Sequence, residues 1–310
     1  MKTMQKKKKM LKDGNVWVYA CLLALPVLQF LIFYVVVYFN SIKLAFQEFN
    51  PGTYEILGFS FANFEKSFDF ILSQDGWNVI KMSLLGWGTH VAVGVPLGLL
   101  FSYYIYKKRF LSSAFRVFLF LPSIIPAIIM VTIYMYAVDN AIPAMIQAIQ
   151  ELPQRPLGLI NNPDTRVFAI LFYNTFISFG TSVLMYSNKM SSIDPSLSEA
   201  ARLDGASTIQ EFWHVTLPMT YSTISVFMVS GVATIFLNQL NLFSFYGWDP
   251  PAGMESLGYY FFYRASEATT YNDMIAFGEL SAMGLIMTCI AIPLTFLVKF
   301  LMKKFGPGEE

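Results

Sequence analysis

The residues of this chain that are best suited to chemical recognition gather in one short stretch, 199–218. The stretch holds carboxylates, an arginine and a histidine, and it lies between two long apolar runs. Its apolar residues recur at the three- and four-residue spacing of helices. A charged, helical segment between two apolar runs must serve a purpose outside lipid. We therefore interpret it as a contact site for a soluble partner rather than as a centre for covalent chemistry.

Local signals predict a first short helix at the start of this contact site. Asp194 followed by Pro195 is typical of a helix N-cap with proline at the first helical position. Ser196 and Glu199 have the spacing of a capping box on the same turn. The helix is expected to end before Gly205, because glycine adopts a positive φ angle at low cost and so permits a sharp turn.

A second helix is predicted after this turn. Ser207 and Gln210 have the spacing of a second capping box, which indicates where the helix begins. Pro218 lies where the next apolar run starts and is expected to end the helix, since proline interrupts helical hydrogen bonding. The two helices and their turn form a helix-turn-helix unit.

This unit resembles the EAA loop in permease subunits of ATP-binding-cassette (ABC) importers. The resemblance rests on Glu-Ala-Ala, Asp-Gly-Ala, a phenylalanine and Leu-Pro in that order. These are Glu199, Ala200, Ala201, Asp204, Gly205, Ala206, Phe212, Leu217 and Pro218. Residues 190–195 and 41–46 are also similar to segments of carbohydrate permeases. The resemblance implies that the EAA-like residues couple the chain to ATPase subunits.

Composition and apolar runs predict a membrane protein of the all-α class. Charged residues make up 13% of the chain, about half of the roughly 25% in soluble domains. At ~1.5 Å per residue, six charge-free runs approach or exceed the ~30 Å hydrocarbon core. The runs are 14–42, 82–106, 117–138, 167–188, 215–248 and 280–298. We expect a polytopic protein with six transmembrane helices, and a further short interfacial helix over 142–152.

The basic residues predict the orientation in the membrane. When alternate sides are assigned along the chain, 15 lysines and arginines fall on one side and 5 on the other, with Lys81 left out as a boundary residue. The positive-inside rule then places both termini in the cytoplasm, together with the coupling loop at about 191–218, between the fourth and fifth helices. Residues 1–13 are expected to form a basic tail, and 14–310 one transmembrane domain like that of type-1 ABC transporters. We expect the protein in a prokaryotic cytoplasmic membrane.

Polar side chains inside the later apolar runs allow two interpretations. Tyr173, Asn174 and Ser178 recur in the fourth run, and Asn238 and Asn241 lie toward the end of the fifth. They are candidates for the lining of a translocation path for a hydroxyl-rich solute. They are also suited to hydrogen bonds between helices, typically worth ~0.6 to 2 kcal/mol per contact. The sequence leaves both open.

Motifs for other chemistry are absent from the sequence. No Gly-x-x-x-x-Gly-Lys-Ser/Thr loop occurs, so ATP binding is expected in a separate ATPase chain. His90 and His214 lie far apart, and Cys21 and Cys289 both fall in apolar runs, which predicts neither a metal site nor a disulfide. We predict no catalytic residue, no metal and no cofactor in this chain.

The resemblance implies an importer permease of the carbohydrate type that works by alternating access. It implies ATPase subunits that carry ATP and Mg²⁺ and a second permease, expected to be a homologous but different chain, although a pair of identical chains stays open. It also implies an extracytoplasmic solute-binding protein, a sugar solute that is expected to be an oligosaccharide, and membrane lipid around the protein. Nucleic acid is not an expected partner. Residues 247–253 lack the Thr-x-Gly-Gly-Pro stretch common in sugar permeases, so a non-sugar solute stays open. The alternative class is an ion-coupled secondary transporter, which would be expected to carry paired buried ionisable residues.

Overall fold

The computed structural model describes residues 16–307, which form two compact units. Unit 1 holds the described residues up to Asp69 together with Glu267–Ile286. Unit 2 holds Phe70–Ser266 and the described residues from Met287 onward. The predicted basic tail, residues 1–13, lies outside the described residues.

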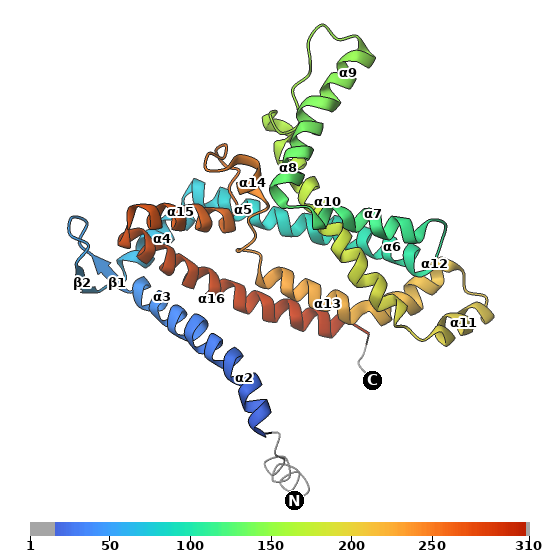
Figure 1. The fold of residues 1–310 in the computed structure, drawn as a ribbon, viewed down its shortest axis with the longest axis horizontal. Coiled ribbons are helices and arrows are strands. Elements are labelled where there is room, and N and C mark those ends of the chain that lie inside the picture. The colour runs from blue at the N-terminus through green and yellow to red at the C-terminus, as the bar shows by residue number, and fades with distance from the viewer. Residues whose placement is uncertain (1–15, 308–310) are drawn as a thin grey trace, which may run out of the picture. The chain divides into compact units, whose positions relative to one another are not determined.

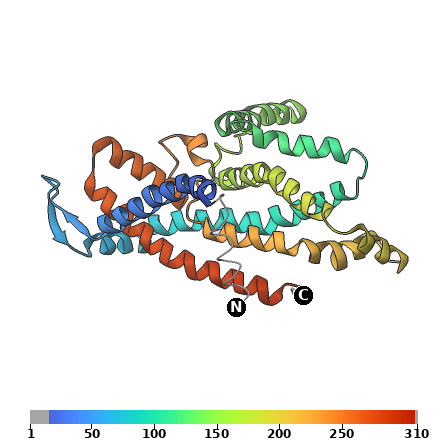
Figure 2. The same cartoon turned by 60° about the horizontal axis from the view of Figure 1, so that its bottom comes forward.

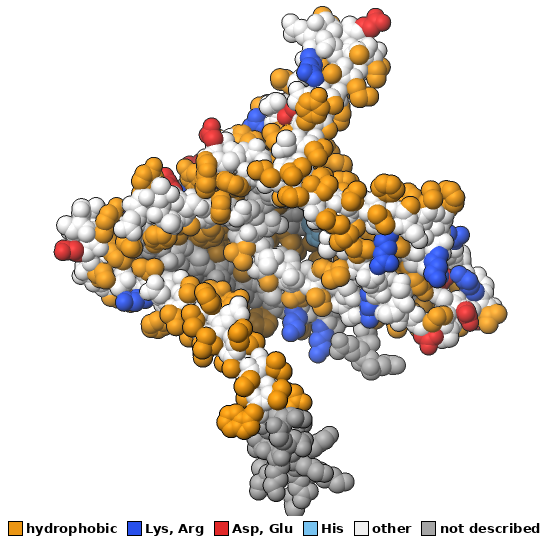
Figure 3. Space-filling model, viewed as in Figure 1, with side chains coloured by type: hydrophobic (Ala, Val, Ile, Leu, Met, Phe, Trp, Pro, Cys, Tyr) orange, Lys and Arg blue, Asp and Glu red, His pale blue; other side chains and the backbone are white. Residues whose placement is uncertain are grey.

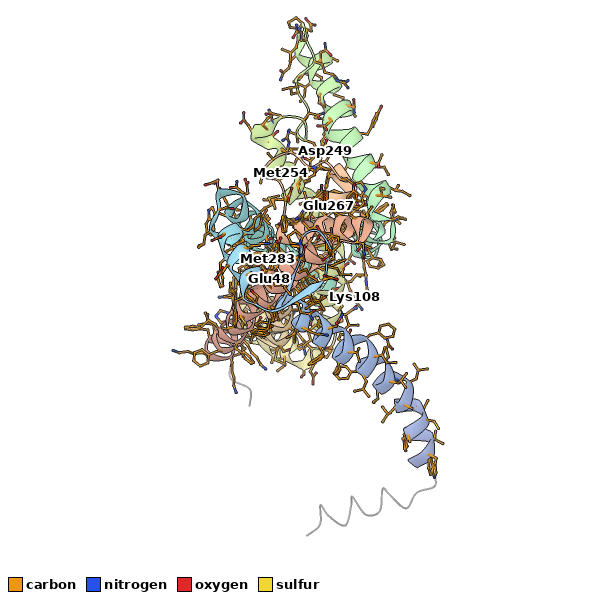
Figure 4. All side chains as sticks on the ribbon, turned by 90° about the vertical axis from the view of Figure 1, so that its left-hand side faces the viewer. Glu48, Lys108, Asp249, Met254, Glu267 and Met283 are labelled. Carbon is orange, nitrogen blue, oxygen red and sulfur yellow. The ribbon has the colours of Figure 1, made fainter. Side chains whose placement is uncertain are left out.

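The first transmembrane helix and a small hairpin belong to unit 1. The helix is continuous through α2 (Val16–Phe30), the π-helical segment η1 (Leu31–Val36) and α3 (Val37–Ala45). After it, β1 (Gln47–Phe49) and β2 (Ile56–Phe59) pair antiparallel, with Gln47 opposite Phe59. Glu48, at the middle of β1, is labelled in Figure 4. This hairpin was not predicted, because its residues lie between the apolar runs that define the helices.

Helix α4 (Ala62–Leu72) ties the parts of unit 1 together. The Asn63 side-chain amide donates to the backbone oxygens of Ala45 and Gln47, at 3.2 and 2.8 Å. The Ser67 hydroxyl donates to the backbone oxygen of Glu279 at 3.1 Å, and Lys66 pairs with the Glu279 carboxylate at 2.8 Å. These contacts join α4 to the end of the first helix and to the first turns of α16.

Unit 2 begins with the second, third and fourth transmembrane helices. The second consists of α5 (Gln74–Thr89), η2 (His90–Gly94) and α6 (Val95–Tyr106). A shorter helix α7 (Ser112–Ile124) precedes the third, which consists of α8 (Ala127–Tyr136), η3 (Ala137–Ala141) and α9 (Ile142–Gln150). The fourth is α10 (Pro163–Ser191), which packs against α6 and α7 (Figure 1). Apolar side chains cover much of the visible surface of α8 and α9, and separately of α2 in unit 1 (Figure 3).

The third helix departs from the prediction in two ways. The apolar run 117–138 is not one helix, because α7 ends at Ile124 and α8 begins at Ala127. Ile125 is extended, with φ −75° and ψ 137°, since the residue before a proline is driven out of the helical region. The separate interfacial helix predicted over 142–152 is wrong as well, because α9 continues the third helix without a break.

The fourth and fifth transmembrane helices are joined by the predicted helix-turn-helix unit, with one correction. Its first helix is α11 (Pro195–Leu203); the second is α12 (Thr208–Glu211), which runs on through η4 (Phe212–Thr216) into α13 (Leu217–Ala233). Pro218 therefore does not end the helix. The π-helical turn η4 lies directly before it, and local π adjustments allow proline inside membrane helices.

The fifth apolar run is helical over only part of its length. The prediction of a helix across 215–248 is wrong beyond Ala233, since 234–241 have no regular helix. The non-helical residues Leu240 and Asn241 have positive φ angles of 51° and 55°. Short helix α14 (Leu242–Tyr246) follows, and the next loop contains Asp249 and the buried Met254 (Figure 4).

The chain ends with α15 (Leu257–Tyr271) and α16 (Met274–Phe305), the sixth transmembrane helix. Among the described residues, six helices are long and apolar enough to cross a membrane. The predicted fold class, an all-α polytopic membrane protein with six such helices, is confirmed.

Candidate functional site

Two features of unit 2 are candidates for function: the helix-turn-helix unit, here called the docking unit (residues 194–218), and a polar cavity among the transmembrane helices. The docking unit lies at one end of unit 2, as both views show (Figures 1 and 2). The cavity is lined by residues of α5, η2, α10, α13 and the irregular segment after α13.

The N-terminus of α11 is fixed by Asp194. Its carboxylate accepts a hydrogen bond from the Ser196 backbone N–H at 3.0 Å, and Pro195 occupies the first helical position. The predicted capping box of Ser196 and Glu199 is wrong, because Asp194 is the N-cap and Ser196 already lies inside the helix. The hydrogen bonds from Ser196 hold the pKa of Asp194 below its ordinary value.

The turn between α11 and α12 depends on Gly205. Its φ angle is +80°, and a Cβ atom built there would meet no atom within 4 Å. The glycine is therefore required by backbone conformation and not by crowding within this chain. After the turn, the predicted capping box of Ser207 and Gln210 is present, with hydrogen bonds of 3.3 and 2.8 Å.

The docking unit exposes apolar side chains beside charged ones. Leu203 is 89% exposed, Ile209 70% and Trp213 57%. Next to them lies an open pocket of about 310 Å³, whose lining includes Gly205 and His214. Lysine and arginine side chains gather toward the same end of unit 2 in Figure 3. This mixture of exposed apolar and charged groups suits contact with a protein.

A buried ion pair fastens the docking unit to the end of the second transmembrane helix. Lys107, which directly follows α6, pairs with Glu211 of α12, and their side chains are only 9% and 3% exposed. The Glu211 carboxylate also accepts a hydrogen bond from Ser198 of α11 at 2.7 Å, whereas the Arg202 Nε lies 4.0 Å away.

Aromatic contacts strengthen the same attachment. The Tyr103 hydroxyl donates to the Thr208 backbone oxygen at 2.9 Å, and the Tyr103 and Phe212 rings lie 4.9 Å apart. The pairing of Lys107 with Glu211 was not predicted from the sequence, because the two residues lie 104 positions apart. The sequence does place the carboxylate of Glu211 immediately before the apolar Phe212, and this position could have indicated a buried carboxylate that needs a partner.

The structure distributes the EAA-like residues over both sides of the docking unit. Phe212 is buried and anchors the unit. Glu199, Ala200, Asp204 and Gly205 are exposed, and Ala201, Ala206, Leu217 and Pro218 are half-buried. Most of the predicted coupling residues are therefore accessible to a partner, and their role stays a prediction.

The cavity has a volume of about 550 Å³. Four of the five predicted path residues line it: Asn174, Ser178, Asn238 and Asn241. The fifth, Tyr173, is buried in the core instead, where its ring lies 5.1 Å from the rings of both Tyr134 and Phe245.

Asparagine side chains hold the irregular segment 234–241 against the fourth helix. Asn174 Nδ2 donates to the Leu240 backbone oxygen at 2.8 Å, and Asn241 Nδ2 donates to Asn174 Oδ1 at 2.8 Å. Asn238 Oδ1 accepts from the Leu240 backbone N–H at 2.9 Å. The same amides thus bond within the fold and line the cavity, so the two interpretations are compatible.

Residues of the second helix complete the cavity wall, although none of them was predicted to line a path. Trp87 and His90 line it, and the ring of His90 lies 3.4 Å from the Ser178 hydroxyl through Nδ1. Gly86 allows the Leu240 side chain to lie close, because a Cβ there would be 2.6 Å from Leu240 Cδ2. The signal available in the sequence was a histidine within an apolar, glycine-rich run.

Metal ligands do not come together in the described part of the chain. No group of three or more His, Cys, Asp or Glu residues there is arranged to hold a metal ion. The two cysteines in it are unpaired thiols.

Six apolar helices, together with a polar cavity and an accessible docking unit in unit 2, are the features of a membrane transport protein. A family model described as "Binding-protein-dependent transport system inner membrane component" matches residues 94–309, and the chain belongs to this family. The prediction of an ABC importer permease is confirmed, as is that of a multi-pass membrane protein.

Relatives match nearly the whole chain. It is 26% identical over 295 residues to the "Probable ABC transporter permease protein YurN" of Bacillus subtilis (strain 168), covering 93% of this chain and 96% of that protein. It is 23% identical to the "Arabinooligosaccharides transport system permease protein AraP" of the same organism, covering 86% and 82%. A crystal structure of a bacterial alginate ABC transporter, in complex with alginate pentasaccharide-bound periplasmic protein, shares the fold with TM-score 0.78, 19% identity and coverage of 98% and 99%.

Proposed function

We propose that this chain is the permease subunit of an ATP-driven importer for a carbohydrate, expected to be an oligosaccharide, and that it moves this solute by alternating access. The observation that carries the proposal is the docking unit. It exposes Leu203, Ile209 and Trp213 to a partner, and at the same time the buried pair of Glu211 and Lys107 fastens it to the second transmembrane helix.

The proposed partner of the docking unit is an ABC ATPase subunit, which would carry the ATP and Mg²⁺. Glu199 lies at the middle of α11 with its side chain exposed. An exposed carboxylate there is suited to an arginine of a partner. The exposed apolar residues beside it would supply the buried core of the interface.

The proposed solute path runs through the cavity. One wall of the cavity contains Trp87 and His90 of the second transmembrane helix. The docking unit is attached to the end of this same helix. Movement of the docking unit with an ATPase would therefore be transmitted to the wall of the cavity. Asn174, Ser178, Asn238 and Asn241 supply polar groups for a hydroxyl-rich solute.

Similar proteins support a sugar solute and a solute-binding protein. AraP is named for arabinooligosaccharides, and the structure with the same fold is that of an alginate transporter with a saccharide-bound periplasmic protein. We therefore infer an extracytoplasmic solute-binding protein. A second permease chain, homologous to this one, is proposed from the resemblance of the EAA-like residues to importer permeases. The excess of basic residues supports cytoplasmic termini, with the docking unit on the same side.

The test is solute-stimulated ATP hydrolysis by the complex purified through this chain and reconstituted in liposomes with its binding protein. We expect an ATPase to co-purify, and both ATP hydrolysis and uptake to rise with a cognate saccharide. An ion-coupled carrier would instead transport without an ATPase when an ion gradient is imposed, and that result would contradict the proposal.

A further inference from the structure

The cavity wall carries no formal charge. None of the described residues that line it is Asp, Glu, Lys or Arg. Its polar groups are instead the hydroxyls of serines and threonines, three asparagine amides, the indole of Trp87 and the imidazole of His90. An ordinary histidine, with a pKa near 6.5, is mostly neutral at pH 7 and above.

Several of these neutral groups keep hydrogen-bonding capacity for a ligand. Within the described chain, no hydrogen bond occupies the Trp87 indole N–H, the Thr181 hydroxyl or the Asn238 side-chain NH₂, and all three line the cavity. The Trp87 indole is held against Gly231, where an added Cβ would lie 3.2 Å from Nε1. A half-buried aromatic ring in the cavity wall, beside neutral donors and acceptors, suits the apolar face and the hydroxyls of a sugar ring.

A charged sugar would be disfavoured in this setting. Each uronate unit of an acidic saccharide carries a carboxylate, which loses its hydration on entering the cavity. Burying an ionised group is costly unless an opposite charge pairs with it. The described residues of the wall offer no lysine or arginine for this.

We propose that this cavity binds an uncharged saccharide and rejects acidic ones, unlike the transporter of the acidic polysaccharide alginate whose fold the chain shares. This inference rests on the proposed function, because it names the chemical class of solute at the same site. The volume of about 550 Å³ falls within the ~300–1,000 Å³ of small-ligand sites.

Protection of a cavity thiol tests the proposal in the whole complex. Thr181→Cys is introduced with Cys21→Ser and Cys289→Ser, and its alkylation is followed by mass spectrometry of this chain. The probes are neutral tetrasaccharides of arabinose, xylose and glucose, together with tetragalacturonate and its methyl ester. A control thiol at Ser191→Cys lies outside the cavity lining.

We expect at least one neutral tetrasaccharide to slow alkylation at position 181 several-fold and leave position 191 unchanged, whereas tetragalacturonate has no effect. Protection by tetragalacturonate equal to or greater than that by every neutral probe would overturn the inference. Protection by no saccharide would also overturn it. In either case, saccharide-stimulated ATP hydrolysis by the same complex would show that the proposed function still stands, and its absence would show that both have failed.

A charge added to the wall provides a second, gain-of-function test. Ser230 lines the cavity, is exposed and makes no side-chain hydrogen bond within the described chain. Ser230→Lys should allow tetragalacturonate to protect position 181, and the uncharged Ser230→Met should not. Equal behaviour of the two variants would contradict the electrostatic basis of the exclusion.

Discussion

Replacing Lys107 with methionine removes the cation that pairs with the buried carboxylate of Glu211. Methionine keeps an apolar stem of similar length but also loses the ammonium group that lies 5.4 and 5.1 Å from the ring centroids of Tyr103 and Tyr106. The Glu211 carboxylate then keeps the hydrogen bond from Ser198 but loses its close counter-charge, since Arg202 lies 4.0 Å away.

The size of the effect follows from the burial of the pair. Removing one partner of a buried ion pair costs about 3 to 5 kcal/mol. Because every 1.4 kcal/mol is a factor of ten, the opening of the docking unit should become roughly two to nearly four orders of magnitude more frequent. Replacing Glu211 with leucine in the same chain should recover most of this, since a buried pair can be exchanged for apolar residues at little cost.

Amide hydrogen exchange of the purified complex measures the local opening directly. The protection of residues 195–211 should fall in Lys107→Met and recover in Lys107→Met/Glu211→Leu. Arg202→Gln is the matched control, because this arginine is 65% exposed and an exposed ion pair contributes about 0 to 1 kcal/mol. Unchanged protection in Lys107→Met, or no recovery in the double variant, would refute the claim that this ion pair attaches the docking unit to the second transmembrane helix.

Three further predictions concern the turn, the cap and the cavity. Gly205→Val should reduce the ATPase retained on the complex more than Gly205→Asn, because φ is +80° and asparagine tolerates this region better; equal retention would contradict a conformational role. The ionised Asp194 cap stabilises α11 at pH values above the ordinary aspartate pKa, and this contribution is lost as the pH falls through the lowered pKa of the folded state. Amide hydrogen exchange from α11, corrected for the intrinsic rate, should therefore rise in acid for the natural chain but not for Asp194→Asn. Identical pH profiles of exchange in the two chains would exclude the cap. Asn174→Leu removes the bonds to Leu240 and Asn241 at about 1 to 3 kcal/mol for the groups left unpaired, so uptake should fall while ATPase retention is normal; parallel loss of both would indicate a purely structural role.

The transmembrane helices were predictable because a helix that crosses lipid requires a long apolar run. The helix boundaries were harder to predict where proline or polar residues interrupt such a run. Pro126 breaks one run into two helices, whereas Pro218 lies within a continuous helix, because a π-helical turn precedes it. Hydropathy cannot separate these outcomes, which depend on the local hydrogen bonding of the backbone.

The candidate site was predictable only where its residues are close in sequence. The turn at Gly205 and the cap at Ser207 follow from local backbone chemistry. The Lys107–Glu211 pair and the bond from Asn174 to Leu240 join distant segments, and no local pattern reports them. Tyr173 was predicted to line the path but is buried in the core. The helical spacing of polar residues does not determine whether a side chain faces the cavity or the core.

Site-specific cross-linking gives the most direct test of the central claim that residues 194–218 dock an ATPase. A photoreactive benzoylphenylalanine is placed at one of two exposed positions, Leu203 at the end of α11 or Trp248 between α14 and α15. Helices α11 and α14 lie apart in unit 2 (Figure 1). If residues 194–218 dock an ATPase, position 203 cross-links to the ATPase subunit in membranes and position 248 does not. An ATPase adduct at 248, with none at 203, would contradict this claim.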